Sequence, residues 1–313
     1  MKAAIIHKYG SPEVLKVEEV PEPQAKPSKI LVEVHAAALN PKDILVRKGK
    51  FRPFSGNKFP MTLSSDYAGI VLNPGKSTVL KEGDKVFGMM NGMRVGSTAE
   101  KVLVKENELA KMPEGISYEE AAGIPLAGLT ALQALRNLGK LSEGHHVCIN
   151  GASGGVGTLA IQIAKCLGAT VTSVSSERNL ALCKSLGADE PIAYTQANWV
   201  QSLQNLDLFF DVFGNYSLAK VRASLTPKGR YISTLPRVST VRSHVFTGLS
   251  PQKGLLVIVN SRSRDLEWLA QQVSNNKIRP IVDSVFSLAE IRQAHERVET
   301  KRSRGKVIIR IKP

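Results

Sequence analysis

Residues 147–165 read VCINGASGGVGTLAIQIAK, and this stretch decides the fold. An apolar strand pattern runs into a set of glycines, and the glycines run into an amphipathic helix pattern. Gly151 permits a tight turn after the strand, and Gly157 lets the helix pack closely on that strand. The stretch therefore predicts a loop whose backbone can approach a pyrophosphate, and its candidate residues are Ser153, Gly154, Gly155 and Val156.

The spacing of these glycines is Gly-x-x-Gly-x-x-Gly rather than Gly-x-Gly-x-x-Gly. Such a run is also compatible with a glycine-rich turn in any α/β protein. Here a strand pattern precedes the run and a helix pattern follows it, so the free N–H groups and the positive dipole end of the helix face the loop. These flanking patterns favour dinucleotide binding.

From residue 145 onward, strand and helix patterns alternate at regular intervals. The strands are apolar almost throughout, as expected for a parallel sheet that is buried on both faces. This alternation predicts an α/β fold with a doubly wound sheet. The predicted strands are 146–150, 170–174, 191–193, 206–212, 229–233 and 254–260, and the predicted helices are 157–167 and 179–186.

Residues 1–110 have a different pattern, in which short apolar runs alternate with proline, glycine and charged residues. Short strands with turn signals between them are typical of a small barrel or sandwich. The tail returns to this pattern after a helix near 288–300. We therefore expect a barrel-like domain at 1–122, an α/β domain at 123–264, and a return segment at 265–313 that completes the first domain.

The end of the second strand of the α/β domain indicates which dinucleotide binds. An NAD site has a carboxylate there for the ribose hydroxyls, whereas an NADP site has hydroxyls and cations. Ser175 and Ser176 stand at this point, and Arg178 can pair with a 2′-phosphate, so we expect NADPH. Two alternatives stay open: Glu177 serves NAD in another register, or Ser176 and Glu177 only begin a helix.

Other candidate cofactor residues follow the remaining strands. Tyr194 comes after the third strand and either adds a hydroxyl to the same phosphate or is a half-buried core tyrosine. Phe213 and Gly214 end the strand at the expected switch point of the sheet, where a cofactor borders the backbone. Asn260 and Arg262 follow the last strand, and we expect them to reach the nicotinamide or the diphosphate.

Composition describes a globular chain with few special constraints. The 313 residues are 42% apolar and 22% charged, which excludes a disordered or fibrous protein. Cys148, Cys166 and Cys183 lack the spacing of a zinc site, and their odd number argues against a disulfide framework. No stretch has the length and apolarity of a membrane helix or a signal peptide, so we expect a soluble cytoplasmic protein.

The net charge of +15 is concentrated in two clusters, one in a loop-like stretch at 42–58 and one at 292–312. Nucleic acid, a membrane surface and an anionic cofactor would all suit a basic protein. Because neither cluster contains a nucleic-acid-binding motif, we expect a solvated basic surface and no specific nucleic-acid partner. Weak electrostatic membrane association is a further possibility.

Several short motifs complete the picture, because they appear in order along the whole chain. They are Asn40-Pro41-Lys42-Asp43, Asp66-Tyr67-Ala68-Gly69, 83–88, 121–131, the glycine loop, 184–189 and Gly305-Lys306-Val307. Together they resemble the medium-chain dehydrogenase/reductase superfamily, and more narrowly its zinc-free quinone oxidoreductases, near the chloroplast-envelope and enone-reductase group. The resemblance implies a GroES-like β-barrel catalytic domain, a Rossmann domain, and a homodimer that pairs two Rossmann sheet edges.

Zinc-dependent members of that superfamily carry a Cys and a Gly-His-Glu where this chain has Asn40 and Ser65-Asp66. A catalytic zinc needs three protein ligands, and no cysteine precedes Cys148, so we expect no metal. The resemblance also implies that Asn40 and Asp43 lie near the nicotinamide and substrate, and that Thr130 contacts the nicotinamide end. Otherwise these three residues are a turn start, a helix cap and an ordinary helix residue.

A site without a Lewis acid suits acceptors that are already electrophilic. We therefore expect an NADPH-dependent, zinc-independent reductase that transfers hydride to small quinones or α,β-unsaturated carbonyls. One alternative is a dedicated enone or alkenal reductase with little quinone activity. Another is an NADPH-binding protein that docks on anionic membrane or RNA.

Overall fold

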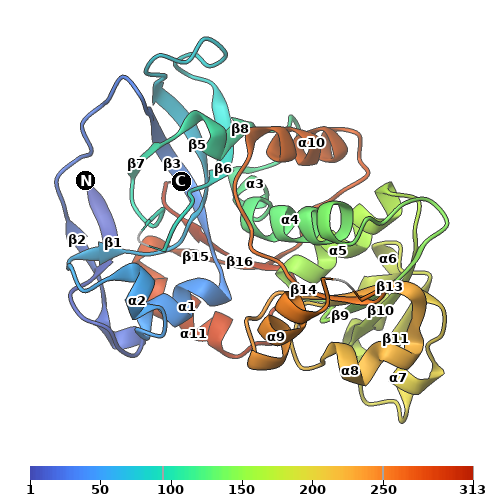
Figure 1. The fold of residues 1–313 in the computed structure, drawn as a ribbon. Helices are drawn as coiled ribbons and strands as arrows, with labels where there is room; N and C mark the ends of the chain where they lie inside the picture. Colours follow the sequence, from blue (N-terminus) through green and yellow to red (C-terminus); the bar gives the residue numbers. More distant parts are fainter. Residues whose placement is uncertain (94, 249, 313) are drawn as a thin grey trace. The chain divides into compact units, whose positions relative to one another are not determined.

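The computed structural model describes residues 1–93, 95–248 and 250–312 (Figure 1). The chain divides into two compact units. Unit 1 consists of residues 1–126 and 260–313, and unit 2 consists of residues 127–259. Each unit has its own β-sheet structure and its own buried apolar residues.

Unit 2 is built on a parallel sheet with the strand order β11-β10-β9-β12-β13-β14. This confirms the doubly wound α/β fold that the alternating pattern predicts. The strands are β9 (His146–Asn150), β10 (Thr170–Ser175), β11 (Glu190–Ala193), β12 (Leu206–Asp211), β13 (Leu225–Ser233) and β14 (Lys253–Leu256). The helices are α4 (Pro125–Leu132, whose first two residues belong to unit 1), α5 (Gly155–Cys166), α6 (Leu180–Ser185), α7 (Trp199–Ser202), α8 (Leu218–Val221) and α9 (Val238–Phe246).

Close contact between α5 and the end of β9 depends on glycine. A Cβ at Gly157 would lie 2.3 Å from the carbonyl oxygen of Gly151 and 2.6 Å from the backbone of Ala152. Real side chains do not tolerate such distances, so only glycine lets the helix begin directly against the loop. Gly151 itself has a φ of 84°, which an L side chain adopts only with strain.

Unit 1 contains a mixed sheet with the order β15-β16-β3-β5-β6-β8, with β7 also paired to β3, and a smaller sheet with the order β2-β1-β4. Among the described residues of unit 1, β15–β16 is the one parallel pair. The strands are β1 (Lys2–Ile6), β2 (Leu15–Glu19), β3 (Ile30–Leu39), β4 (Met61–Thr62), β5 (Asp66–Asn73), β6 (Lys85–Met89), β7 (Lys101–Val104), β8 (Leu109–Lys111), β15 (Val282–Ser287) and β16 (Lys306–Arg310). The helices are α1 (Pro41–Arg47), α2 (Arg52–Ser55), α3 (Tyr118–Ala122), α10 (Ser263–Ser274) and α11 (Ile291–Glu299).

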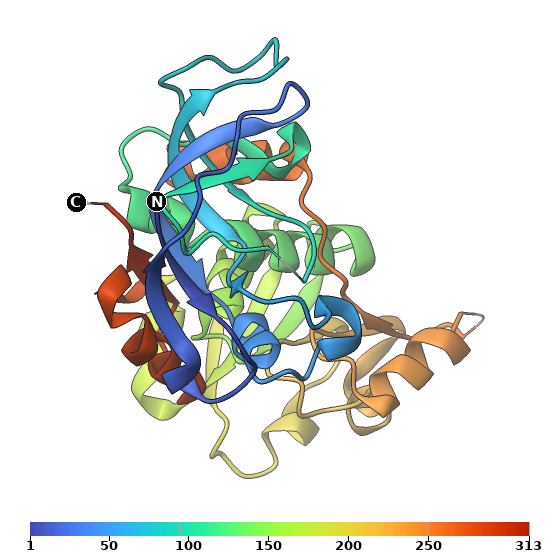
Figure 2. The same cartoon turned by 90° about the vertical axis from the view of Figure 1, so that its left-hand side faces the viewer.

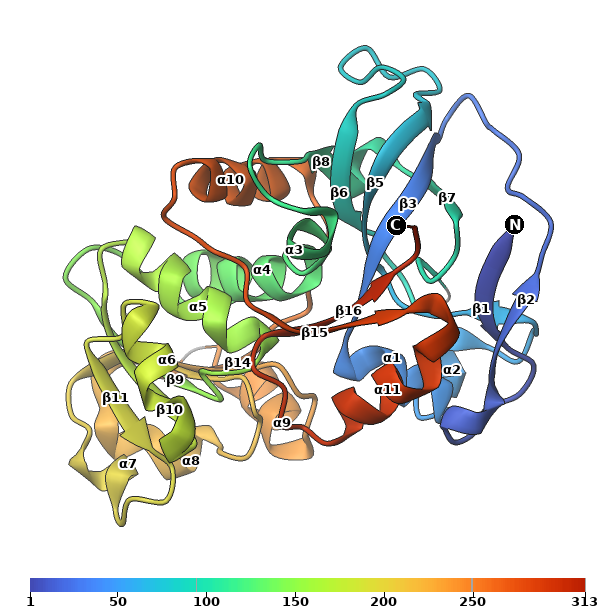
Figure 3. The same ribbon diagram turned by 180° about the vertical axis from the view of Figure 1, so that it is seen from behind.

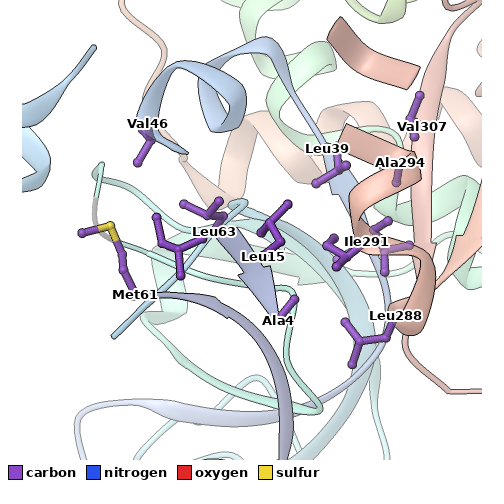
Figure 4. Packing of buried hydrophobic residues seen from close by; sticks show 13 residues of the cluster. Ala4, Leu15, Leu39, Val46, Met61, Leu63, Leu288, Ile291, Ala294 and Val307 are labelled. Atoms are coloured by element: carbon purple, nitrogen blue, oxygen red, sulfur yellow. The ribbon is translucent and has the colours of Figure 1, made fainter. Parts of the chain in front are cut away.

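The two ends of the chain meet in unit 1. Strand β16 pairs antiparallel with β3, and α11 lies against the N-terminal strands (Figures 2 and 3). Side chains from both ends form one buried apolar cluster, in which Leu15 packs with Ile291 and Val307 (Figure 4). The C-terminal segment therefore completes a core that residues 1–126 cannot close alone.

The structure corrects several details of the sequence-based expectations. The stretch at 42–58 is largely helical rather than a loop, because Asn40 and Asp43 form a capping box around Pro41 at the start of α1. Strand β14 ends at Leu256, whereas the apolar run predicts a strand as far as Asn260. Helix α4 ends at Leu132, and a π-helical segment, Gln133–Leu138, follows it directly.

Two cations of the basic clusters are not solvated. Arg47 is fully buried and pairs with Glu299, and Lys306 is buried and pairs with Asp66. Unpaired charges in such positions would cost several kcal/mol, so both cations are tied to carboxylates. The solvated-surface interpretation is therefore wrong for these two residues. No helix among the described residues is long and apolar enough to cross a membrane.

Replacing Gly157 with alanine tests the close approach of α5. We expect Gly157→Ala to lower the free energy of unfolding by about 1–3 kcal/mol, because backbone atoms must move to admit the Cβ. The matched control is Gly154→Ala, where the nearest atom to a new Cβ is the Gly151 oxygen at 3.7 Å. Urea unfolding followed by circular dichroism measures both, and equal losses of stability would contradict the role assigned to Gly157.

Candidate functional site

The glycine loop is fastened to the neighbouring strand. The backbone N–H groups of Gly151 and Ala152 both donate to the carbonyl oxygen of Val174, at 3.0 Å each. Helix α5 then begins at Gly155 with Gly154 as its N-cap. The N–H groups of its first turn have no acceptor within the helix, so they and the helix dipole offer a site for an anionic group.

Hydroxyl and amide groups from β10 lie beside this loop. The Asn179 amide donates to Ser153 Oγ at 2.9 Å and so joins the loop to the segment after β10. Ser175 is buried, Ser176 is half-buried and Arg178 is exposed. Ser176 precedes a short 3₁₀ turn, yet its hydroxyl makes no capping hydrogen bond, so the purely structural interpretation of this serine is not supported.

Asn179 is a candidate site residue that the sequence reasoning missed. It is nine-tenths buried or more, and its Oδ1 has no hydrogen-bond partner within the described parts of the chain. An amide oxygen can only accept hydrogen bonds, and leaving a buried acceptor unpaired is unfavourable. The geometry therefore provides a place for a donor group, such as a hydroxyl, beside Ser153.

Tyr194 follows β11 and lies beside the end of β10. Its backbone N–H donates to the Ser175 carbonyl oxygen at 2.9 Å, and its side chain is 57% exposed. It is therefore not a core tyrosine. Its phenol is available to a ligand that lies over Ser175 and Ser176.

A buried polar network shapes the loop that carries Phe213 and Gly214. The Asp211 carboxylate accepts from the Gly214 N–H at 2.8 Å and from the Tyr231 hydroxyl at 2.9 Å. The Asn150 amide also donates to Asp211, at 2.7 Å, which connects the ends of β12 and β9. Burial, followed by the charge of Asp211, raises the pKa of Tyr231, so this phenol stays a donor at neutral pH.

Asn40 lies in unit 1, in a second polar cluster. Its amide Nδ2 donates to Asp66 Oδ2 at 2.9 Å and to the Ala38 carbonyl oxygen at 3.3 Å, and its Oδ1 accepts from the Lys306 ammonium. Lys306 also contacts Asp66 Oδ2, at 3.1 Å. Both amide hydrogens of Asn40 are thus engaged within the protein, which leaves them unable to donate to a substrate.

Asp43 adjoins this cluster. Its Oδ2 accepts from the Asn40 N–H at 2.8 Å. Complete burial, opposed by the charge of Lys42, raises the pKa of Asp43 to about 6. The carboxyl group therefore titrates near neutrality, which is the range useful for proton exchange.

The remaining candidates divide between the units. Thr130 is buried in the α4 segment of unit 2. Asn260 and Arg262 belong to unit 1 and are exposed, and the intervening Ser261 N–H donates to Asn91 Oδ1 at 2.8 Å. The structure brings the Ser153–Val156 loop, Ser175, Ser176, Tyr194 and Gly214 to the carboxyl ends of the unit 2 strands. It places Asn40 against Lys306, and Asp43 against Asn40.

Comparison with known families identifies the chain. Residues 26–114 match the alcohol dehydrogenase GroES-like domain, and residues 186–309 match the zinc-binding dehydrogenase family. The chain belongs to the medium-chain dehydrogenase/reductase superfamily. This superfamily consists of oxidoreductases dependent on pyridine nucleotides, and its GroES-like and Rossmann domains are the expected fold.

Individual relatives span nearly the whole chain. It is 35% identical to 2-methylene-furan-3-one reductase of Solanum lycopersicum and 33% identical to an NADPH-dependent alkenal/one oxidoreductase of Arabidopsis thaliana, each over 99% of this chain and 79% of the relative. Among solved structures, the quinone oxidoreductase of Coxiella burnetii is 32% identical, with a TM-score of 0.90, and covers 100% of this chain and 99% of that one.

The name of one matched family raises the question of zinc. At the positions where zinc ligands are expected, this chain has Asn40 and Ser65-Asp66, and the polar atoms of Asn40 and Asp66 are engaged by the Lys306 ammonium. Within the described residues no group of three His, Cys, Asp or Glu side chains could hold a metal ion. An amide, a hydroxyl and one carboxylate around an ammonium do not fit the donor set of a catalytic zinc.

Removing the buried ammonium tests its partnership with Asp66. We expect Lys306→Met to lower the free energy of unfolding by about 3–5 kcal/mol, because the Asp66 carboxylate stays buried without its cation. The double variant Lys306→Met/Asp66→Asn removes both charges and should recover part of that loss. Chemical unfolding measures the three proteins, and a double variant that is less stable than Lys306→Met would contradict the ion pair.

The raised pKa of Asp43 predicts a pH-dependent contribution to stability. A carboxyl whose pKa is higher in the folded state favours folding fully below about pH 4, and this contribution is lost as the pH rises through about 6. Asp43→Asn removes the titration. Relative to the parent protein, the variant should gain about 2–3 kcal/mol of stability between about pH 4 and pH 7, measured by urea unfolding. A constant difference across this range would refute the assignment.

Proposed function

We propose that this protein is an NADPH-dependent reductase of quinones or α,β-unsaturated carbonyls. The proposal rests on the groups at the carboxyl ends of β9 and β10. There the N-terminus of α5 lies together with Ser175, Ser176 and the unpaired Asn179 oxygen. The names of the quinone and alkenal/one oxidoreductase relatives support the acceptor class.

Different residues at these strand ends bind different parts of the cofactor. The first-turn N–H groups of α5 hold the pyrophosphate, and Asn179 Oδ1 accepts a hydrogen bond from a ribose hydroxyl. Ser176, Arg178 and Tyr194 hold the 2′-phosphate, since hydroxyls and a guanidinium suit a doubly charged anion. Glu177, on which the alternative NAD site would depend, is exposed and is the only carboxylate directly after β10 in the sequence.

Asp211 acts indirectly. It positions the loop on the nicotinamide side of the site and does not itself touch the nicotinamide. Its carboxylate fixes the loop that carries Phe213 and Gly214 through the Gly214 N–H. A fixed backbone here presents a flat surface to the ring and excludes water from one of its faces. Asn260, Arg262 and Thr130 are proposed to contact the nicotinamide or the diphosphate from their own segments.

The bound nicotinamide supplies the hydride, and the protein supplies orientation and charge stabilisation. The Lys306–Asp66 ion pair holds the Asn40 side chain in place, and a developing enolate or hydroquinone anion is stabilised by hydrogen bonds and protonated from water. We propose that Asn40 acts by holding this geometry and that Asp43 lies near the acceptor. Such a site suits acceptors whose own conjugation makes them electrophilic.

Three further expectations accompany this proposal. The domain boundaries expected from the sequence, 1–122, 123–264 and 265–313, stay predictions, and the two compact units divide the chain at 126/127 and 259/260. A homodimer and a cytoplasmic location, both expected from the sequence, stay predictions. Light scattering of the purified protein and fractionation of the cells that make it would test them.

The deciding experiment measures NADPH oxidation by the purified protein at 340 nm, a wavelength at which the reduced nucleotide absorbs and the oxidised nucleotide does not. The acceptors are 9,10-phenanthrenequinone and, separately, a medium-chain enone, with NADH as the control donor. We expect turnover with NADPH and at least tenfold lower kcat/KM with NADH, because only NADPH has a 2′-phosphate for Arg178. A preference for the enone alone would favour the dedicated enone reductase.

Variants of the proposed nucleotide-binding residues separate effects on binding from effects on folding. Arg178→Gln should raise KM for NADPH about tenfold or more while KM for NADH hardly changes, since it removes a contact to the 2′-phosphate only. Gly154→Ala, whose new Cβ would lie 3.7 Å from the nearest atom, should weaken the binding of both nucleotides by crowding the pyrophosphate. Tight NADPH binding without turnover of either acceptor would refute the reductase proposal and favour a nucleotide-binding protein.

A further inference from the structure

Lys42 is a half-buried cation next to the polar cluster of Asn40. It is the second residue of α1 and follows the Asn40-Pro41 pair directly. Its ammonium donates to Ser65 Oγ at 2.8 Å and to the Gly92 carbonyl oxygen at 3.1 Å. The side chain therefore reaches from α1 to Ser65, which is fully buried and immediately precedes β5.

The ammonium of Lys42 keeps a donor that the described part of the chain does not use. An ammonium has three N–H donors, and here the described residues supply two acceptors. Both acceptors are neutral oxygens, and no described carboxylate forms an ion pair with Lys42. One N–H and the full positive charge are thus left for a ligand.

The other polar groups of the cluster are less suited to a ligand. Lys306 is buried, and its ammonium is shared between Asn40 Oδ1 and the Asp66 carboxylate. Asn40 gives both of its amide hydrogens to the protein. A cation that is paired with a carboxylate attracts a new anion weakly, whereas an ammonium held by neutral oxygens keeps its attraction. Lys42 is therefore the donor of this cluster that a ligand can use.

The charge of Lys42 acts on the group that we propose to lie near the acceptor. Among the influences that oppose burial, it is the strongest one that lowers the pKa of Asp43. Asp43 in turn accepts from the Asn40 N–H at 2.8 Å. The ammonium thus belongs electrostatically to the residues of unit 1 that we assign to the acceptor.

We propose that the Lys42 ammonium binds the carbonyl oxygen of the acceptor and stabilises the negative charge that forms on it. The inference rests on the proposed reductase function and names the group that recognises its acceptor. A site that lacks the donor set of a catalytic zinc polarises a carbonyl by hydrogen bonds and fixed charge instead. The favoured acceptors have a carbonyl oxygen conjugated to the carbon that receives hydride.

The reaction balances with Lys42 in this role. Hydride from the bound nucleotide forms a C–H bond at the β-carbon of an enone, and the displaced π electrons leave one negative charge on the carbonyl oxygen. The Lys42 N–H donates a hydrogen bond to this oxygen and keeps its proton. Water then protonates the α-carbon, so the carbonyl re-forms and hydroxide is released. The acceptor is reduced by the electron pair that the nucleotide loses.

Removing the ammonium tests its contact with the acceptor. We expect Lys42→Met to lower kcat for a medium-chain enone about 100-fold or more, the size of effect that the loss of one oxyanion donor has. The loss with 9,10-phenanthrenequinone should be smaller, because a hydroquinone anion is less basic than an enolate. Lys42→Arg keeps the charge and should retain about a tenth or more of the enone activity.

The matched control is Lys50→Met, which removes an exposed cation of the same chain segment. It should leave kcat unchanged for both acceptors. In all of these variants circular dichroism should be unchanged and KM for NADPH should stay within about twofold of the parent value, since the ammonium holds neither the fold nor the nucleotide. Equal kcat values for Lys42→Met and the parent protein would overturn the inference.

Ser65 is a positioning residue for this ammonium. Ser65→Ala removes one anchor of the Lys42 head group and should lower kcat for the enone about threefold to tenfold. In the Lys42→Met background the same substitution should have no further effect, because it acts only through the ammonium. Losses that multiply in the double variant would overturn the inference.

An oxyanion probe tests the contact without hydride transfer. 4-Nitrophenol is added to the protein loaded with oxidised nucleotide, and the visible absorbance of its phenolate is followed against pH. A nearby cation favours the phenolate, so the bound probe should ionise at a lower pH in the parent protein than in Lys42→Met. Equal ionisation in both proteins, or no binding of the probe, would overturn the inference.

The two kinds of failure are distinguishable. Turnover by the parent protein with no effect of Lys42→Met would overturn the role of Lys42 alone. Binding and ionisation of the probe without turnover of either acceptor would refute the reductase function, and the assignment of Lys42 to an acceptor would fall with it.

Discussion

The buried ammonium of Lys306 holds unit 1 together at a point where four segments meet. It binds Asn40 at the end of β3 and Asp66 at the start of β5, and Lys306 itself begins β16. The second carboxylate oxygen of Asp66 accepts from the Leu126 N–H at 2.8 Å, where α4 begins. Burying a charge is tolerable only when its partners are fixed, so this cluster constrains the register of three strands and the entry into unit 2. The same cluster engages the amide of Asn40, and the charges of Lys42 and Lys306 oppose the rise that burial causes in the pKa of Asp43.

In unit 2, buried polar side chains also need partners, and they find them at the carboxyl ends of the parallel strands. Strands that are buried on both faces leave polar side chains room only at their ends. Asn150, Asp211 and Tyr231 use that room for a network that satisfies its own members and fixes a loop. Asn179 differs from them, because its oxygen is buried and unpaired among the described residues. A network that is complete stabilises the fold, and the unpaired Asn179 oxygen is the feature on which the proposed nucleotide site rests.

Local signals predicted the α/β half of the molecule well. The glycines of the loop, the β-branched run of β10 and the apolar runs of β9 and β12 each depend on neighbouring residues in the sequence, so their pattern is legible without the fold. Helix α1 was missed because the cations between Lys42 and Lys58 suggest a solvated loop, whereas the capping box between Asn40 and Asp43 starts a helix. Strand β14 was drawn too long because an apolar run has no signal for the point at which its partner strand ends. Helix α10 was missed because its polar residues outnumber the apolar ones that face the protein.

The sequence by itself determined the glycine loop before α5, the six strands of unit 2 with the helices α5 and α6, and the serines and arginine after β10. Each of these depends on residue types at short spacing, which is local information. Only the tertiary structure decided that Lys306 joins Asn40 and Asp66 across more than two hundred residues, and that Asn179 reaches Ser153. The physical reason is that burial and pairing depend on what the rest of the chain brings to a residue. A lysine in a basic tail and a lysine in a buried ion pair look the same until the strands that enclose them are in place.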